Sequence, residues 1–164
     1  LFAKNFTKKG GRFIFCENAS EADNNFNNIL EENSWTEKNI FCSSKNVILK
    51  FGLNTNSLSL KLNQSNVFLT TCEYLIANKG NILISNNQLK NYKLNELPIN
   101  IIVFSSINRI VNDVSEGMTV LKNKYKNKVP SNITTLKPKK LIEENDFLSY
   151  GNSAKNIYLL LQDE

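Results

Sequence analysis

The segment INIIVFSS, residues 99–106, constrains the fold of this chain more than any other. Nearly all of its positions up to Phe104 are apolar, so it lacks the alternation of a strand that faces water on one side. Uninterrupted apolar strands are typical of parallel sheets, which are covered on both faces. We therefore expect this segment to be an inner strand of a buried sheet.

Strand and helix patterns alternate along the rest of the chain. Strands are expected at 11–17, 38–44, 66–71, 81–85 and 156–162, with a loop or short strand at 129–138 and a strand or mobile connection at 58–62. Helices or helical turns are expected at 20–33, 45–52, 73–77 and 107–125, with a polar loop or short helix at 89–97. This order predicts an α/β three-layer sandwich with a mostly parallel sheet.

Local signals set the ends of several of these elements. Ser20 and Asp23 resemble a capping box at the start of the 20–33 helix. Gly52 and Gly80 are expected to end helical turns, and at Gly80 we expect a positive φ.

Composition excludes several classes of enzyme. The chain contains no His, which removes Ser-His and Cys-His nucleophile pairs and the usual metal ligand. Cys16, Cys42 and Cys72 are far apart, so neither a disulfide framework nor a metal motif is indicated. We interpret them as free thiols in a reducing compartment, which predicts a cytoplasmic protein. We expect no membrane association, because no apolar run approaches the ~18 residues of a membrane-spanning helix.

Lysine is concentrated in one part of the chain. Between residues 117 and 142 there are seven lysines and no acidic residue, although the net charge of the whole chain is only +5. Such a segment could bind nucleic acid, an acidic partner or an anionic ligand. The chain has only two arginines, Arg12 and Arg109, and arginine is the preferred residue for bidentate phosphate contacts. We therefore do not expect nucleic acid as a partner, and an electropositive binding module is a third-ranked hypothesis.

Four motifs occur in a fixed order from about Gly11 to the C-terminus: FLTTCEYLIANKGNILIS, LPINIIVFSSINRIVNDV, PSNITTL and YGNSAKNIYLLL. Their succession resembles the LUD domain, the lactate-utilisation family of LutC and YkgG. The most specific element is Glu73, followed by Ile76-Ala77, Gly80 and an apolar strand. The resemblance implies a fold similar to the NagB/RpiA/CoA-transferase superfamily. It also implies one domain over residues 1–164, with residues 1–10 as an N-terminal extension.

The resemblance also implies a function. LutC-like proteins look like components of bacterial L-lactate utilisation systems that oxidise lactate to pyruvate, and their companion subunits carry iron–sulfur clusters. We therefore expect an accessory or assembly component with iron–sulfur subunits as partners. We expect no cofactor on this chain itself, which has neither a Cys ligand set for a cluster nor a strand–GxGxxG–helix motif for a dinucleotide. The alternative is a stand-alone enzyme of the CoA-transferase or sugar-phosphate-isomerase type, or an anionic small-ligand-binding domain, that uses Glu73. Whether the chain forms an oligomer stays open.

Candidate site residues lie mainly in loops that follow strands, because ligands of open α/β sheets bind beyond the carboxyl ends of the strands. Their hydroxyl, amide and backbone N–H groups suit an anion. The residues expected to bind ligand are Thr70, Thr71, Lys79, Gly80, Asn81, Ser105, Ser131, Asn132, Asn152 and Ser153. Glu73 is the candidate nucleophile or general base. Alternatively, Glu73 lies in the first turn of a short helix that is capped by Thr70 or Thr71, where its negative charge interacts favourably with the helix dipole.

The chain departs from the common LUD pattern at two places. Ile133 and Thr135 stand where the family commonly has Thr and Asp, and Asn152-Ser153-Ala154 stands where it often has His-Gly-Pro. Two polar positions of the site implied by the resemblance are therefore altered.

Overall fold

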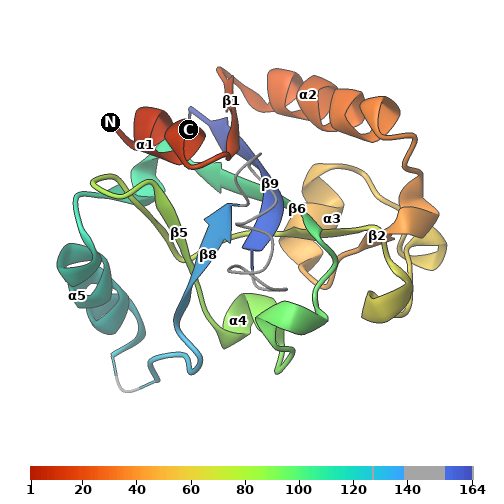
Figure 1. Ribbon diagram of the computed structural model, residues 1–164. Coiled ribbons are helices and arrows are strands. Elements are labelled where there is room, and N and C mark those ends of the chain that lie inside the picture. The colour runs from red at the N-terminus through yellow and green to blue at the C-terminus, as the bar shows by residue number, and fades with distance from the viewer. Residues whose placement is uncertain (127, 139–153, 164) are drawn as a thin grey trace, which may run out of the picture.

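The structure, a computed structural model, describes residues 1–126, 128–138 and 154–163. Figure 1 shows a sheet with helices packed around it. Five strands form a parallel array in the order β2–β3–β6–β9–β1. They are β1 (Arg12–Cys16), β2 (Ile40–Phe41), β3 (Val67–Thr70), β6 (Asn100–Ser106) and β9 (Ala154–Gln162).

A second group of strands continues from β9 through β8, β5, β4 and β7. These are β8 (Thr134–Pro138), β5 (Asn81–Ile84), β4 (Tyr74–Ile76) and β7 (Ile110–Val111). β5 is antiparallel to both of its neighbours, whereas β4 and β7, and β8 and β9, pair in parallel. The sheet is therefore mostly parallel, and the expected α/β sandwich is confirmed.

Five α-helices accompany these strands in the described part of the chain. They are α1 (Phe2–Lys8), α2 (Ala19–Glu32), α3 (Lys45–Lys50), α4 (Asn86–Leu89) and α5 (Val114–Tyr125). In Figure 1, α2 and α3 lie beside the parallel strands, and α5 lies beside the antiparallel group. None of the helices in this part of the chain is long and apolar enough to cross a membrane.

β6 is covered on both faces, as its uninterrupted apolar run predicts. Ile101 and Val103 belong to a buried cluster with residues of α1, β4, β5 and β8. Ile102, between them in the sequence, belongs to a second cluster with residues of α2 and α3. Because successive side chains of a strand point to opposite faces, β6 contributes to both hydrophobic cores.

The N-terminal residues 1–10, expected to form an extension that precedes the domain, contain α1. Phe2 and Phe6 of this helix are buried in the same cluster as Ile101. The side chain of Asn5 donates a hydrogen bond to the carbonyl oxygen of Ala77 at 2.8 Å. α1 therefore packs against the turn between β4 and β5.

The prediction of a helical turn at 73–77 is wrong. Residues 74–76 form β4, which pairs with β5 on one side and with β7 on the other. Every residue from Glu73 to Ala77 is buried. A short, fully buried strand cannot be distinguished from a buried helical turn by periodicity, and only its partners, distant in sequence, decide the conformation. The positive φ of Gly80 is confirmed at 66°, but it belongs to the β4–β5 hairpin.

Two other boundaries also differ from prediction. The 107–125 helix begins only at Val114, because 107–109 form a 3₁₀ turn and β7 then pairs with β4. α2 begins at Ala19, where the side chain of Asn18, rather than that of Ser20, accepts from the N–H of Glu21. Residues 58–62, expected as a strand or a mobile connection, form no strand.

The hairpin turn offers a direct test of the packing between α1 and the sheet. A Cβ on Gly80 would lie 2.3 Å from the backbone nitrogen of Phe6, and φ is positive there. Gly52 has a similar φ of 62° with no atom within 4 Å of the corresponding position, so it is a matched control. We expect Gly52→Ala to lower the free energy of unfolding by about 1 kcal/mol. For Gly80→Ala we expect at least about 3 kcal/mol, measured by urea denaturation. Equal losses in the two variants would contradict close packing of α1.

Candidate functional site

Glu73 lies in the short connection between β3 and β4 and is only 1% exposed. Its backbone N–H donates to the carbonyl oxygen of Leu83 at 2.8 Å, which fixes the residue against β5. A buried carboxylate is costly unless it is hydrogen-bonded. The groups around this side chain therefore determine what it can do.

Four side chains donate hydrogen bonds to the Glu73 carboxylate. Oε2 accepts from Ser85 Oγ at 2.6 Å, from Asn87 Nδ2 at 3.0 Å and from Gln88 Nε2 at 3.2 Å. Oε1 accepts from the Tyr125 hydroxyl at 3.2 Å. Three donors lie at the start of α4 and the fourth ends α5, so the carboxylate joins both helices to the strands. Hydrogen bonds to an ionised acceptor are strong. Both oxygens are engaged, and the arrangement makes Glu73 a structural acceptor.

The start of α4 is itself organised by a capping box. The N–H of Ser85 donates to Gln88 Oε1 at 2.7 Å, and the Ser85 hydroxyl accepts from the N–H of Asn87 at 3.1 Å. Ser85-Asn86-Asn87-Gln88 matches the Ser-x-x-Gln capping pattern, so this part of the site had a sequence signal that our prediction missed.

Two further groups complete the surroundings of Glu73 and had no local sequence signal. Arg109 donates through Nη1 to the carbonyl oxygen of Glu73 at 3.3 Å, and its guanidinium lies 5.7 Å from the centre of the Tyr74 ring. Tyr125 also accepts a hydrogen bond from Asn87 at 3.2 Å. Both residues reach the site only because β7 pairs with β4 and α5 then packs nearby.

The alternative placement of Glu73 in a capped helical turn is wrong, because residues 70–76 contain no helix. Thr70 ends β3, and Thr71 follows it. Both threonines line a pocket of about 320 Å³ together with Asn87 and Gln88, two of the residues that bind Glu73. The structure therefore places this predicted pair beside Glu73, although not as helix caps.

The other predicted site residues are dispersed. Lys79, Gly80 and Asn81 lie at the opposite end of the β4–β5 hairpin from Glu73, where Asn81 accepts a hydrogen bond from Lys9 at 3.0 Å. Ser105 is buried and accepts from the Cys72 thiol at 3.3 Å. Asn152 and Ser153 are outside the described residues.

The loop before β8 contains the remaining pair of predicted residues. The carbonyl oxygen of Ser131 accepts from the N–H of Asn86 at 2.8 Å, so this loop touches the start of α4. Asn132 has a positive φ of 55° and lines a different pocket, of about 650 Å³, beside Tyr92 and Leu94. The two residues therefore border α4 without joining Thr70 and Thr71 in one cavity.

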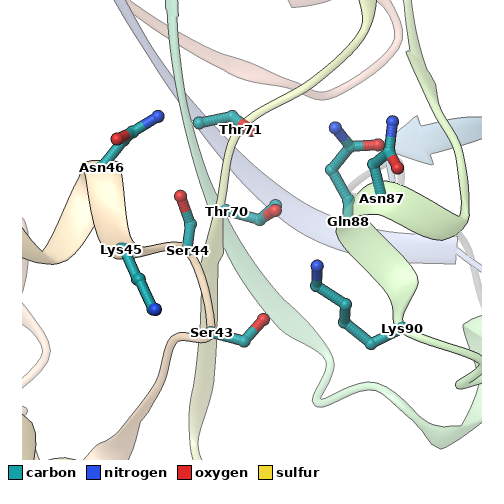
Figure 2. A pocket seen from close by; sticks show the side chains of 9 residues that line it. All are labelled: Ser43, Ser44, Lys45, Asn46, Thr70, Thr71, Asn87, Gln88 and Lys90. Atoms are coloured by element: carbon teal, nitrogen blue, oxygen red, sulfur yellow. The ribbon is translucent and has the colours of Figure 1, made fainter.

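The 320 Å³ pocket is formed by three segments that are distant in the sequence (Figure 2). The segment after β2 contributes residues 43–46, the end of β3 contributes the two threonines, and α4 with its C-terminal residue Lys90 forms the opposite wall. β2 and β3 are adjacent and parallel, so their carboxyl ends open at the same edge of the sheet. Residues 43–46 and Lys90 were missed by sequence reasoning.

Burial raises the pKa values of two groups in this region. Burial raises the pKa of the Cys72 thiol to about 11, although the hydrogen bond to Ser105 opposes the shift. Burial also raises the pKa of the Tyr125 hydroxyl, and the negative charge of Glu73 and the hydrogen bond to it act in the same direction. Both groups are therefore neutral at physiological pH. Neither is prepared to act as an anionic nucleophile or base.

Comparison with known proteins identifies the family. Residues 48–161 match the model of the LUD domain, so the chain belongs to the LUD domain family. The fold is similar to that in the crystal structure of a DUF162 family protein from Deinococcus radiodurans, with a TM-score of 0.69 and 14% identity. That alignment covers 98% of this chain and 93% of the other. Among curated proteins, none matches the chain at a significant level.

The raised pKa of Cys72 predicts a loss of stability at alkaline pH. The folded protein keeps the thiol proton up to about pH 11, whereas the unfolded chain releases it near the ordinary value of 9.0. This contribution is therefore complete below pH 9 and is lost as the pH rises toward 11. Between these values the thiol should lower the free energy of unfolding by about 1.4 kcal/mol per pH unit.

The contribution of Cys72 can be isolated by comparing the wild type with Cys72→Ala in urea denaturation between pH 8 and pH 11. The variant should have a lower free energy of unfolding at every pH, because the contacts of the Cys72 side chain are lost. Its free energy of unfolding should, however, decline less steeply above pH 9. Parallel curves for the two proteins would show that burial does not raise the pKa of the Cys72 thiol.

Proposed function

We propose that this LUD-domain chain is a cytoplasmic accessory or assembly subunit of a bacterial L-lactate utilisation system, in which partner subunits carry the iron–sulfur clusters. Family membership supports the proposal, because the motifs around Glu73 resemble the LutC-like branch of the family. The chemistry of lactate oxidation then belongs to the partners, and this chain supports their assembly or their contact with one another.

One observation carries the accessory role. The acid that the family motif contains, Glu73, is buried and receives hydrogen bonds from four side chains of its own domain. A nucleophilic or basic carboxylate needs at least one lone pair directed at a substrate. Oε1 accepts only the bond from Tyr125, but the residue is 1% exposed, so a substrate could reach this oxygen only if the start of α4 or the end of α5 moved. The residue is better suited to holding the domain together.

The second candidate is a stand-alone enzyme or small-ligand-binding domain of the CoA-transferase or sugar-phosphate-isomerase type. The pocket beside Asn87 and Gln88 favours the ligand-binding form of this candidate, because it opens at the carboxyl ends of two parallel strands. A turnover that Glu73→Gln abolishes without unfolding the domain would support the enzymatic form instead of the accessory role.

The proposed contact surface for the partners is the lysine segment at and after the end of α5. Lys122, Lys124, Lys126 and Lys128 are all exposed. Four exposed cations within seven residues favour an acidic partner surface, because long-range electrostatic attraction steers the two proteins together. Lys139 and Lys140, which continue this segment in the sequence, are outside the described residues.

Copurification tests this proposal. A tagged wild-type chain, expressed from its own locus in lactate-grown cells, should copurify with subunits that contain iron–sulfur clusters. Reversal of charge at Lys122, Lys124 and Lys128 should reduce the recovered partner at least about tenfold, because unlike charges become like charges. Reversal at Lys38, Lys61 and Lys79, three exposed lysines outside the segment, is the matched control and should leave recovery unchanged.

Thermal melting of each variant would confirm that it is folded before partner recovery is compared. Recovery that never includes an iron–sulfur protein would contradict the proposed function. Equal losses in the two triple variants would contradict the proposed contact surface.

A further inference from the structure

We propose that the 320 Å³ pocket between the 43–46 segment, the end of β3 and α4 binds a small phosphate-bearing metabolite, with Ser43, Thr70 and Lys90 as the groups that hold its phosphate. This inference names the ligand class of the pocket that favours the second candidate function, and it does not depend on the accessory role. Four features support it: the direction of the side chains, an unpartnered hydroxyl, the charge of the lining and the backbone of Lys90.

The polar ends of three side chains converge in the pocket. Figure 2 shows the hydroxyl oxygens of Ser43 and Thr70 and the ammonium group of Lys90 directed toward the same space. They come from three different segments, and all three line one cavity. Lys45 and Asn46 also line it but point away from this group in Figure 2, so they belong to the rim. The convergent groups are two hydroxyls and one cation, all able to donate hydrogen bonds to an oxyanion.

The hydroxyl of Thr70 is the most informative group in the pocket. Thr70 is only 4% exposed, yet within the described part of the chain its hydroxyl makes no hydrogen bond. The other buried hydroxyls of the site, those of Ser85 and Ser105, both have partners. The Thr70 hydroxyl is not enclosed by protein, since the enclosed side-chain oxygen without a partner among the described residues is Gln162 Oε1. It is therefore open to a ligand in the pocket.

The charge of the lining selects an anion. Lys45 and Lys90 both line the pocket, and neither forms an ion pair with a described residue. No Asp or Glu is among the described residues of the lining. Glu73 is nearby, but Asn87 and Gln88 cover its carboxylate, and Arg109 lies against its backbone. Lys90 inside the pocket and Lys45 on its rim, with no carboxylate among the described lining residues, favour an anion.

The backbone of Lys90 is unusual for a lysine. It has φ 50° and ψ 46°, the left-handed conformation at the C-terminus of α4, where glycine or asparagine is normally preferred. The following residue, Asn91, also has a positive φ, of 72°. Such conformations are unfavourable for residues with a Cβ and concentrate at ligand-binding sites. In this structure the conformation accompanies an ammonium group that points into the pocket.

The size of the pocket indicates a small metabolite rather than a free ion. A volume of about 320 Å³ is at the lower end of the range for ligand pockets and exceeds what one phosphate group occupies. The rest of the lining includes Thr71 and Asn87, whose hydroxyl and amide groups suit a hydroxylated remainder. A phosphate monoester of a small polyhydroxy compound has this combination of charge and polarity.

Titration with inorganic phosphate tests the site. Amide resonances of the wild type should shift at Ser43, Thr70 and Lys90, with a Kd on the order of 1 mM at constant ionic strength. Lys90→Gln should weaken phosphate binding at least about tenfold, since a charge-assisted hydrogen bond is lost. Lys79→Gln, which removes an exposed lysine outside the pocket, is the matched control and should bind as the wild type does.

Two further variants separate binding from folding. Lys90→Gly should weaken phosphate binding as much as Lys90→Gln does, yet melt at the same or a higher temperature, because glycine tolerates the positive φ. Thr70→Val should weaken binding about threefold or more without lowering the melting temperature, because the lost hydroxyl has no partner within the described chain.

Three results would overturn the proposal. The first is that the folded wild type does not bind phosphate. The second is that Lys90→Gln and Thr70→Val bind phosphate as the wild type does. The third is that L-lactate binds at these residues in preference to phosphate. None of them depends on whether iron–sulfur partners are recovered, so the failure of this site and the failure of the accessory role are distinguishable.

Discussion

The burial of one carboxylate organises the part of the domain that contains the candidate site. Glu73 is inserted between β4, α4 and α5, and it receives donors from both helices. α4 has only four residues and cannot be stable by itself, so tertiary contacts must hold it in place. Because Lys90 ends α4 and forms a wall of the pocket, the position of the proposed phosphate site depends on this buried acid.

Structure and proposed function are linked because the structural role and the ligand-binding role fall on different residues. The most specific residue of the family motif maintains the architecture, and the groups that remain available to a ligand are Ser43, Thr70 and Lys90, in the neighbouring cavity. A ligand-binding accessory subunit is consistent with both features. A bound metabolite could then affect the lysine segment, because Tyr125 at the end of α5 shares Asn87 and Glu73 with the wall of the pocket.

The sequence allowed prediction of the elements whose pattern is local. The apolar run of β6 indicated a strand covered on both faces, and α2 showed helical spacing of its buried residues. The segment 73–77 was assigned the wrong structure, because it is buried on every side and only its pairing with β5 and β7 makes it a strand. β7 likewise interrupts what the spacing of apolar residues suggested was one continuous helix.

The candidate site was predictable only in part, for the same reason. Glu73 and the two threonines could be identified from the motif and from their position after a strand. Ser43 and Lys90 are 27 residues before and 20 residues after Thr70, and only the folded sheet brings them to one cavity. The role of Glu73 was also hidden in the sequence. Its donors Ser85, Asn87 and Gln88 precede no recognisable catalytic motif, although their capping-box pattern was visible.

Hydrogen exchange of the α4 amides tests most directly whether Glu73 organises this region. The amides of Gln88, Leu89 and Lys90 donate to carbonyl oxygens within the first turn of α4. In Glu73→Gln, their protection should fall at least about tenfold, because charge-assisted hydrogen bonds that hold the helix are lost. Amides of β6 and β9 should exchange as slowly as in the wild type. Unchanged protection of the three α4 amides would contradict the account.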